Sequence, residues 1–382
     1  MNICVINSLW GTYARGGAEN VLKLLIVEML QQGHQVFLIT THPLPDTVVR
    51  EINGLKVFYL TSNFYNQDKL PYWLRFFWHI IRIFNISTYS KVKKILEKEQ
   101  VEIVWTHNLI GLGFLIFNLF KTKRFRHFHT LHDIQLLHPS GLLMFGKEDM
   151  ISSVVARVYQ DIIRSYLSTF STIISPSQWL LDLHHQHGFF LKNRSLVLSN
   201  PVKQEIVLKK KNLNPEKKFT FLYVGQIESH KGIDILIDAV TSLDTQDAEL
   251  IVVGSGSLLE DLKHNTSDQR IIFKNHQSPE QVKSIMSEAD CLVVPSRCYE
   301  NYPTVILEAR FVGLPVIGSN FGGIQEMIQH EQLLFTPTLS ELRTKLDWCI
   351  VHDTELKNIF NGEKNNSMLV EDYLTRISLI QS

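Results

Sequence analysis

Residues 295–328 read PSRCYENYPTVILEARFVGLPVIGSNFGGIQEMI, and their pattern decides the fold class. An apolar run at 291–295 predicts a buried strand. Pro303 suits the first position of a helix, Gly313 suits its end, and a second apolar run follows at 315–318. A strand, a helix and a strand in this order indicate parallel strands joined by a crossover helix.

The same alternation of short apolar runs and helical spacing extends along the whole chain. In the first half, strands are expected near residues 2–7, 35–40, 101–106, 126–131, 172–175 and 195–199. In the second half, they are expected near residues 219–224, 248–253, 270–273, 291–295, 315–318 and 333–335. Gly33 is placed as the C-terminal cap of one helix, and Ser278 with Pro279 as the start of another. The pattern predicts the α/β class, with two Rossmann-like, doubly wound parallel sheets facing across a cleft.

The length of 382 residues favours two to three packing units at about 150 residues each. The charged stretch KKKNLNPEKK at 209–218 marks the boundary between two of them. The expected divisions are a first domain at 1–200, a linker at 201–218, a second domain at 219–360 and a C-terminal helix at 361–382, which could pack back on the first domain.

Composition narrows the class of protein. Hydrophobic residues make up 45% and charged residues 20% of the chain, which excludes disordered and low-complexity proteins. The net charge is zero, so it gives no argument for a nucleic-acid partner, and none is expected. Residues 1–200 nevertheless hold 20 basic and 13 acidic side chains, a net +7, which leaves 18 and 25, a net −7, for residues 201–382.

The cysteines and apolar runs bear on location. Four cysteines, at 4, 291, 298 and 349, form no C-x-x-C pair, which favours a reducing compartment. The N-terminal residues lack the basic start and cleavage site of a signal peptide. The longest apolar stretch, 109–120, is shorter than the ~20 residues that a membrane helix needs. A cytoplasmic location is expected.

Two carboxylates in the quoted stretch, Glu300 and Glu308, are separated by seven residues. Glu300, on the loop after a strand, could orient the hydroxyls of a sugar, and Glu308 could accept hydrogen bonds from two vicinal ribose hydroxyls. The first free amides of the helix, near Thr304 and Val305, favour phosphate binding. The arrangement predicts a site for a sugar, a diphosphate and a nucleoside, although each Glu could also be an ordinary surface carboxylate.

The segment resembles the E-x7-E region of retaining glycosyltransferases of family 4, also called group 1, which have the two-domain GT-B fold. Similar strings follow in the family's order: GGAE at 16–19, THN at 106–108, LHD at 131–133, SNP at 199–201, VGQIESHKG at 224–232 and VVGSG at 252–256. The resemblance therefore extends from the first strand to about residue 335. It implies that a sugar is transferred from a nucleoside-diphosphate sugar with retention of its anomeric configuration.

The resemblance and the chemistry of the residues together assign roles. Catalytic roles are expected for Glu300, which holds the sugar, for Lys231, which binds the diphosphate, and for His132, which faces the donor sugar from a strand end. The residues expected to bind the donor are Gly16, Gly17, Gly225, Gln226, Lys231, Gly254, Asn301, Tyr302, Pro303, Thr304 and Glu308.

The diphosphate loop departs from the family pattern at one position, where Gln226 replaces the usual Arg. Three explanations stay open: Lys231 and the helix amides suffice, another cation such as Arg297 substitutes, or activity is weak. No D-x-D pair follows a strand. We therefore expect Lys231 and the amides to neutralise the leaving diphosphate, with no metal and no further cofactor.

Two other motifs suggest competing sites. His127, His129, His132 and His138 raise a zinc hypothesis, but His127 and His129 alternate in an apparent strand, and a helical H-x-x-x-H pair is absent, so no metal site is expected. The string GSGS at 254–257 is only a fragment of the dinucleotide fingerprint, and it is a weak signal for NAD.

Residues 58–84 hold ten aromatic side chains, and the apolar positions from Trp73 to Phe84 form one helical stripe. The favoured interpretation is a helix buried on its own domain. The positive first half leaves open a peripheral contact with an anionic membrane at its inner face. The basic residues that would take part are Arg75, Arg82 and Lys91.

The chain is thus predicted to be a metal-independent hexosyltransferase. The domain at 219–360 would bind the nucleotide sugar, and the domain at 1–200 a glycan or lipid-linked acceptor. Cell-surface polysaccharide synthesis is the expected context by analogy. Three alternatives stay open: a sugar-nucleotide epimerase on a similar scaffold, a hydrolase that uses the two Glu residues, and a non-catalytic nucleotide-sugar-binding subunit, which Gln226 makes conceivable.

Overall fold

The computed structural model describes residues 1–14, 16–62, 83–203, 218–363 and 368–378. The chain divides into two compact units, each of which is described by itself. Unit 1 comprises Met1–Leu143, Lys147–Lys203 and Met368–Ser382, and unit 2 comprises Met144–Gly146 and Gln204–Ser367. Most of the linker expected at 201–218 and most of the aromatic stripe expected at 73–84 lie outside the described residues.

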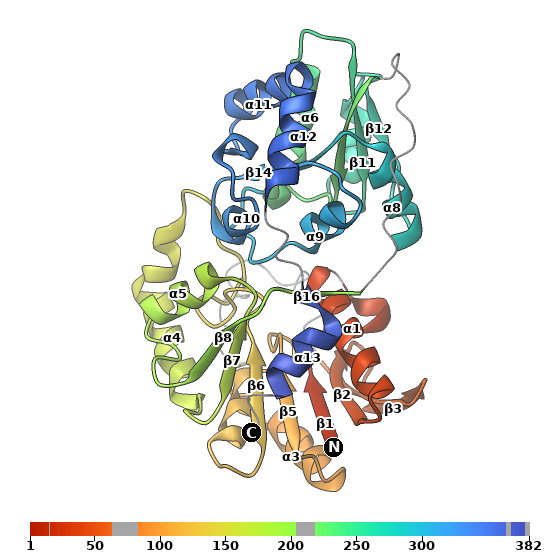
Figure 1. The fold of residues 1–382 in the computed structure, drawn as a ribbon. Helices are drawn as coiled ribbons and strands as arrows, with labels where there is room; N and C mark the ends of the chain where they lie inside the picture. The colour runs from red at the N-terminus through yellow and green to blue at the C-terminus, as the bar shows by residue number, and fades with distance from the viewer. Residues whose placement is uncertain (15, 63–82, 204–217, 364–367, 379–382) are drawn as a thin grey trace. The chain divides into compact units, whose positions relative to one another are not determined.

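Unit 1 is built on an eight-stranded sheet with the order β3-β4-β2-β1-β5-β6-β7-β8 (Figure 1). The strands are β1 (Asn2–Ile6), β2 (Gln35–His42), β3 (Val48–Ile52), β4 (Leu55–Thr61), β5 (Ile103–Thr106), β6 (Arg126–Thr130), β7 (Thr172–Ser175) and β8 (Arg194–Val197). The helices are α1 (Gly17–Gln31), α3 (Ile86–Lys98), α4 (Val154–Tyr166), α5 (Gln178–Gln186) and α13 (Val370–Ser378), with 3-10 turns η1 (Gly11–Tyr13), η3 (Phe114–Phe120) and η4 (Glu148–Ser152). All six predicted strands are present in this sheet, as expected from their continuous apolar runs.

The hairpin of β3 and β4 was not predicted. The strands are antiparallel, and Ile52 pairs with Leu55 across a two-residue turn. Asn53 and Gly54 form this turn at φ values of 50° and 80°, the geometry of a type I′ hairpin turn, which favours Asn-Gly. β3 is largely exposed, so it lacks the apolar run that marks a buried strand.

The C-terminal helix α13 belongs to unit 1, although 164 residues assigned to unit 2 precede it in the chain from Gln204 to Ser367. Figure 1 shows α13, in blue, beside α1, in red. Val370, Tyr373 and Ile377 are buried in one core cluster with Leu25 of α1. The short strand β16 (Met368–Leu369) pairs with β9 (Pro201–Val202), which brings the chain back to unit 1.

Unit 2 is built on a six-stranded parallel sheet with the order β12-β11-β10-β13-β14-β15. The strands are β10 (Phe219–Val224), β11 (Ala248–Val253), β12 (Ile271–Phe273), β13 (Cys291–Val294), β14 (Val316–Ser319) and β15 (Leu334–Phe335). The helices are α6 (Ile233–Thr241), α7 (Leu259–Asn265), α8 (Pro279–Glu288), α9 (Thr304–Phe311), α10 (Gly322–Met327), α11 (Leu339–Val351) and α12 (Asp353–Gly362), with 3-10 turns η5 (Ser229–Lys231) and η6 (Glu331–Leu333). Each predicted strand of the second half is present.

The predicted helix ends have the expected geometry. The Ser278 hydroxyl accepts a hydrogen bond from the amide of Gln281, and the side-chain oxygen of Gln281 accepts one from the amide of Ser278. Pro279 occupies the first helical position of α8. Gly33 follows the last residues of α1 at φ 79°, a conformation that favours glycine. No helix in the part of the chain that the structure describes is long and apolar enough to cross a membrane.

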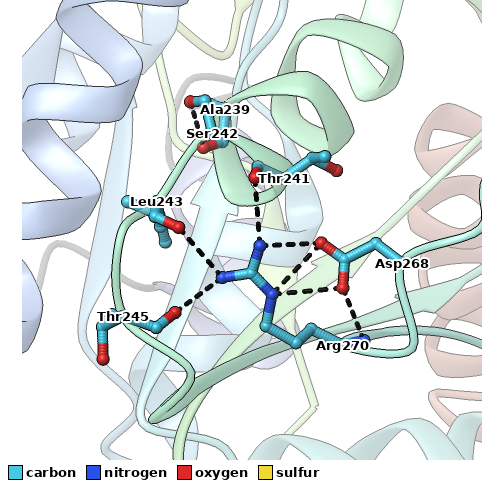
Figure 2. Close-up of polar contacts among 7 residues, drawn as sticks. All are labelled: Ala239, Thr241, Ser242, Leu243, Thr245, Asp268 and Arg270. Carbon is cyan, nitrogen blue, oxygen red and sulfur yellow. Dashed lines mark hydrogen bonds and ion pairs between the residues drawn. The ribbon is translucent and has the colours of Figure 1, made fainter.

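Arg270 anchors the C-terminal end of α6 (Figure 2). Its guanidinium donates hydrogen bonds to the carbonyls of Thr241, Leu243 and Thr245, and it forms an ion pair of 2.7 Å with Asp268. The arginine side chain is only 6% exposed. Because the last carbonyls of a helix lack partners within the helix, this contact stabilises the C-terminal end of α6.

Candidate functional site

The predicted donor residues of unit 2 lie on loops that follow the carboxyl ends of β10, β11 and β13. The first two loops touch through glycines. A Cβ atom at Gly254 would lie 1.8 Å from the carbonyl oxygen of Gly225, and one at Gly256 would lie 2.2 Å from that of Ile227. Gly254 also has φ 150°. The backbones can approach this closely only because neither position carries a side chain.

The loops after β10 and β13 are joined by backbone hydrogen bonds. The amides of Arg297 and Cys298 both donate to the carbonyl of His230, at 3.0 and 3.1 Å. Gly232 has φ 71°, and a Cβ atom there would lie 1.9 Å from the carbonyl oxygen of Pro295. These contacts place the turn that carries Lys231 directly beside the segment that leads to Glu300.

Lys231 and Glu300, 69 positions apart in the sequence, form an ion pair with Nζ and Oε1 2.5 Å apart. The hydroxyl of Ser296 donates to the same oxygen at 2.9 Å, and the thiol of Cys298 lies 3.8 Å from it. The Lys231 and Glu300 side chains are 24% and 16% exposed. The pair is therefore largely shielded from water yet still reachable by a ligand.

The electrostatics of the pair keep both groups charged. Burial alone would raise the pKa of the Glu300 carboxyl, but the Lys231 ammonium outweighs it, and the pKa lies below its usual value. Burial alone would lower the pKa of Lys231, but Glu300 raises it above its usual value. Burial and the nearby Glu300 charge raise the pKa values of the Cys298 thiol and the Tyr223 phenol, which stay protonated.

The loop from Asn301 to Pro303 leads into α9, which begins at Thr304. Thr304 hydrogen-bonds the Glu308 carboxylate one turn later, while burial raises the pKa of Glu308. All five residues, Asn301, Tyr302, Pro303, Thr304 and Glu308, are partly exposed. Because the first amides of a helix lack partners within it, the partly exposed start of α9 suits an anion.

The glycines at the start of α10 support this loop, a role that the sequence reasoning missed. The amide of Gly323 donates to the carbonyl of Glu300 at 2.8 Å. A Cβ atom at Gly323 would lie 1.4 Å from the carbonyl oxygen of Asn301, and Gly322 has φ 64°. The pair stands in the quoted stretch as FGG, 22 residues after Glu300, so a paired-glycine signal was present.

α9 is anchored at its other end by a second ion pair. Arg310 lies 2.6 Å from Glu363, and both side chains are nearly inaccessible. Arg310 also donates to the carbonyl of Met327, at the end of α10. Glu363 accepts hydrogen bonds from the amides of Gln329 and His330. Arg310 therefore joins the C-terminal end of α9, the helix that carries Glu308, to Glu363 and to the end of α10.

Gln226 and Arg297 lie on or beside the loop that the sequence predicts to bind the diphosphate. The phenol of Tyr223 donates to the carbonyl of Gln226 at 2.5 Å, which fixes the backbone there. Arg297 contacts Ser229 of the loop at 3.3 Å and pairs with Asp234 at 2.9 Å. An arginine thus does reach this loop, with its charge partly balanced by Asp234.

Gly16, Gly17 and His132 belong to unit 1. Gly17 is the first residue of α1, and the amide of Gly16 donates to the Glu19 carboxylate at 2.8 Å. The Glu19 carboxylate therefore caps the start of α1, as the Glu at the third position of a capping box does. The donor-binding role of Gly16 and Gly17 stays a prediction.

His132 ends a column of four stacked rings. Its ring centroid lies 5.2 Å from that of His107, which lies 5.5 Å from Trp105, and Trp105 lies 6.3 Å from Tyr373 of α13. His132 Nε2 and His107 Nδ1 are 2.9 Å apart. Burial lowers the pKa of His132 to about 4, and it lowers that of His107 as well. Both imidazoles are therefore neutral at pH 7.

Asp133, next to His132, is a carboxyl with an unusual pKa. Its oxygens accept hydrogen bonds from the Asn108 amide group at 2.9 Å and from the Gln135 backbone amide at 2.7 Å. Burial nevertheless raises its pKa to about 7. The carboxyl end of the unit 1 sheet therefore presents two neutral imidazoles and a carboxyl that exchanges its proton near neutral pH.

His127 and His129 are part of the core. His127 and His129 both contact the Thr106 hydroxyl at 2.8 Å, and His127 also contacts Ser171 at 2.6 Å. Among the residues that the structure describes, no group of three or more His, Cys, Asp or Glu side chains could hold a metal ion.

Comparison with known proteins identifies similar sequences and folds. A family model described as "Glycosyl transferases group 1" matches residues 204–361, and one described as "Glycosyltransferase Family 4" matches residues 15–205. The chain is 26% identical over 381 residues to the "Uncharacterized 42.6 kDa protein in cps region" of Klebsiella pneumoniae, with 98% of this chain and 99% of that protein covered.

Two solved structures share the fold. Sucrose-phosphate synthase from Thermosynechococcus elongatus has a TM-score of 0.74 at 17% identity, with 100% of this chain and 98% of that chain covered. Anabaena HepE, solved in complex with UDP, has a TM-score of 0.69 at 16% identity, with 100% and 99% covered.

Proposed function

The chain belongs to family 4 of the glycosyltransferases, also called group 1, and on this premise we propose that it moves a hexose from a nucleoside-diphosphate sugar to a glycan or lipid-linked acceptor. The observation that carries the proposal is the Lys231–Glu300 ion pair at the carboxyl ends of β10 and β13. Parallel sheets bind ligands at this edge, and a phosphate near the Lys231 ammonium would gain a charge-assisted hydrogen bond.

In the proposed reaction, the bond between the sugar's anomeric carbon and the diphosphate oxygen breaks, and a bond to the acceptor hydroxyl forms on the same face. The acceptor's proton passes to the departing phosphate oxygen. Lys231 and the first amides of α9 stabilise the charge that develops on that oxygen. Glu300 orients the sugar, Glu308 the ribose, and His132 a sugar hydroxyl. Retention of configuration follows from attack on the face that the diphosphate leaves.

No divalent ion or further cofactor takes part in this proposal, because Lys231 and the amides supply the positive charge. Activity is expected to be the same after exhaustive treatment with EDTA and after addition of Mg²⁺ or Mn²⁺. A loss with EDTA that Mn²⁺ restores would assign the neutralising role to a metal.

Binding of the nucleotide is the first test. A thermal-shift panel of UDP, GDP and ADP should show that one of them raises the melting temperature, since a ligand bound only by the native state stabilises it. UDP is the first choice, because HepE was solved with it. Lys231→Ala and Glu308→Ala should abolish the shift. Lys263→Ala, which changes a lysine that pairs with Glu260 of its own helix, should preserve the shift.

Product analysis separates transfer from epimerisation or hydrolysis. A transferase yields nucleoside diphosphate only together with an extended acceptor, whereas an epimerase yields a changed sugar nucleotide without acceptor. The relative in the Klebsiella cps region supports cell-surface polysaccharide synthesis as the context, and lipid-linked acceptors as the first to try.

We also propose that the protein works in the cytoplasm, with unit 1 in contact with the inner face of a membrane. The support is the net +7 of residues 1–200 and the strongly exposed Ile86, at 69%, at the start of α3, which also carries Lys91. Charge reversal at Arg75, Arg82 and Lys91 should reduce sedimentation with anionic liposomes. Equal and negligible sedimentation of both proteins would reject the contact.

A further inference from the structure

Three residues, Met144–Gly146, belong to unit 2, although the residues before and after them in the sequence belong to unit 1. Met144 forms an antiparallel bridge with Cys298. The amide of Phe145 donates to the carbonyl of Arg297 at 2.9 Å. This short strap is thus attached to the segment that leads to Glu300 by the same kind of hydrogen bond that joins strands in a sheet.

The ring of Phe145 lies flat on the ring of Phe321. Their centroids are 4.8 Å apart and their planes differ by 8°, while Tyr299 packs against Phe321 at 4.7 Å. Phe321 is 6% exposed, whereas Phe145 is 45% exposed. One face of Phe145 is therefore covered by an aromatic ring, while nearly half of the residue's surface stays exposed.

The position of this stack relates it to the candidate site. Phe321 directly precedes Gly322 and Gly323, whose backbone contacts the carbonyls of Glu300 and Asn301. The amide of Phe145 donates to the carbonyl of Arg297, which lies three residues before Glu300 in the same loop. Two separate segments thus hold one exposed aromatic ring against the loop that carries Glu300.

We propose that Phe145 is a stacking platform for a pyranose ring. The axial C–H groups of a hexopyranose form a weakly positive, apolar face, which suits the negative face of an aromatic ring. Because the backbone bridge and the Phe321 ring already immobilise Phe145, binding a sugar there costs little side-chain entropy. The inference rests on the proposed function for its ligand class, and the sugar could belong to the donor or to the acceptor.

Saturation-transfer NMR on the full chain tests the platform directly. The probes are the methyl glycosides of glucose, galactose and N-acetylglucosamine, with and without UDP, and UDP-glucose compared with UDP alone. Phe145→Leu keeps an apolar side chain on Phe321 but removes the ring, and Phe145→Trp keeps an aromatic face. Phe170→Leu is the matched control, because Phe170 is 54% exposed in unit 1 and contacts Lys123.

We expect Phe145→Leu to weaken binding of the sugar ring about 2- to 12-fold, the range for one aromatic contact, with Phe145→Trp and Phe170→Leu close to wild type. If Phe145→Leu weakens binding of the sugar ring only for UDP-glucose, the platform belongs to the donor sugar. If it weakens binding only of a methyl glycoside, the platform belongs to the acceptor. Equal transfer to the sugars in wild type and Phe145→Leu, or no transfer to any sugar in wild type, overturns the inference. Binding of UDP alone reports separately on the proposed function.

Discussion

His184, on α5, allows a quantitative prediction about pH and stability. The side chain is fully buried, its Nδ1 lies 2.8 Å from the carbonyl of Leu180, and its Nε2 is buried without a hydrogen-bond partner among the described residues. Burial lowers the pKa of His184 to about 4. Protonation would place a charge between apolar groups such as the ring of Phe189. His184→Leu removes this titration and keeps an apolar side chain.

The sign follows from proton binding. Below pH ~6.5 the unfolded chain protonates His184, while the folded chain stays neutral until about pH 4, so stability is fully present above pH 6.5 and declines as the pH falls. At pH 5.5 the loss is about 1.4 kcal/mol, close to a tenfold change in the unfolding equilibrium. This amount depends on the unfolded pKa and hardly on the folded pKa while that value stays below about 5.

Comparison with a variant isolates this group from its neighbours. His129 and His132, with pKa values of about 3 and about 4, act in the same direction as His184. Asp133, with a pKa of about 7, acts in the opposite direction, because its folded form binds the proton first. These contributions are nearly the same in wild type and His184→Leu, because burial, and not His184, is the largest cause of the low pKa of His129. The difference between the two proteins therefore reports mainly on His184.

The assay is native-state hydrogen exchange of the amides of β6 and β7, which reports the opening free energy of the unit 1 sheet. Between pH 7.5 and pH 5.5, the wild-type value should fall by about 1.3 kcal/mol more than that of His184→Leu. Leu181→Ala, a core substitution in the same helix that removes no titrating group, should lower the opening free energy by the same amount at pH 7.5 and at pH 5.5. Identical pH dependence in wild type and His184→Leu, or an NMR titration of His184 near pH 6.5, would refute the reasoning.

Four further predictions concern the two units. In a double-mutant cycle of Lys231→Met and Glu300→Gln, urea unfolding should give a coupling energy of about 2 kcal/mol, and no coupling would contradict the ion pair. Arg270→Ala should lower the stability of unit 2 by about 3 kcal/mol, because Asp268 and three carbonyls lose their partner; a change below about 0.5 kcal/mol would speak against the anchor in Figure 2. Tyr373→Leu should shift the imidazole resonances of His107 and His132 and lower kcat, whereas Tyr373→Phe should leave the resonances and kcat unchanged. Unchanged resonances in Tyr373→Leu would mean that α13 does not influence His132. Gln226→Arg should tighten binding of UDP about tenfold, measured by calorimetry, and unchanged affinity would mean that Arg297 or the amides already neutralise the diphosphate.

The sequence by itself determined the class of fold, the order of the main strands and the family. Buried parallel strands are short, continuous apolar runs, and helix ends carry Ser, Pro and Gly, so both signals are local and readable. The glycosyltransferase family and its GT-B fold, inferred from the quoted stretch and its companions, are confirmed by the comparisons. The β3–β4 hairpin was missed because its outer strand is exposed and lacks a continuous apolar run, although Asn53-Gly54 marked its turn.

Which side chains contact each other could be seen only in the tertiary structure. Lys231 and Glu300 received separate roles from the sequence, and the folded chain pairs them because the loops after β10 and β13 share backbone hydrogen bonds. The excursion of Met144–Gly146 into unit 2 and the stacking of Tyr373 toward His132 join segments more than 150 and 200 residues apart. Such contacts depend on where the strands end in space. A periodic pattern along the chain does not encode the distance between two strand ends.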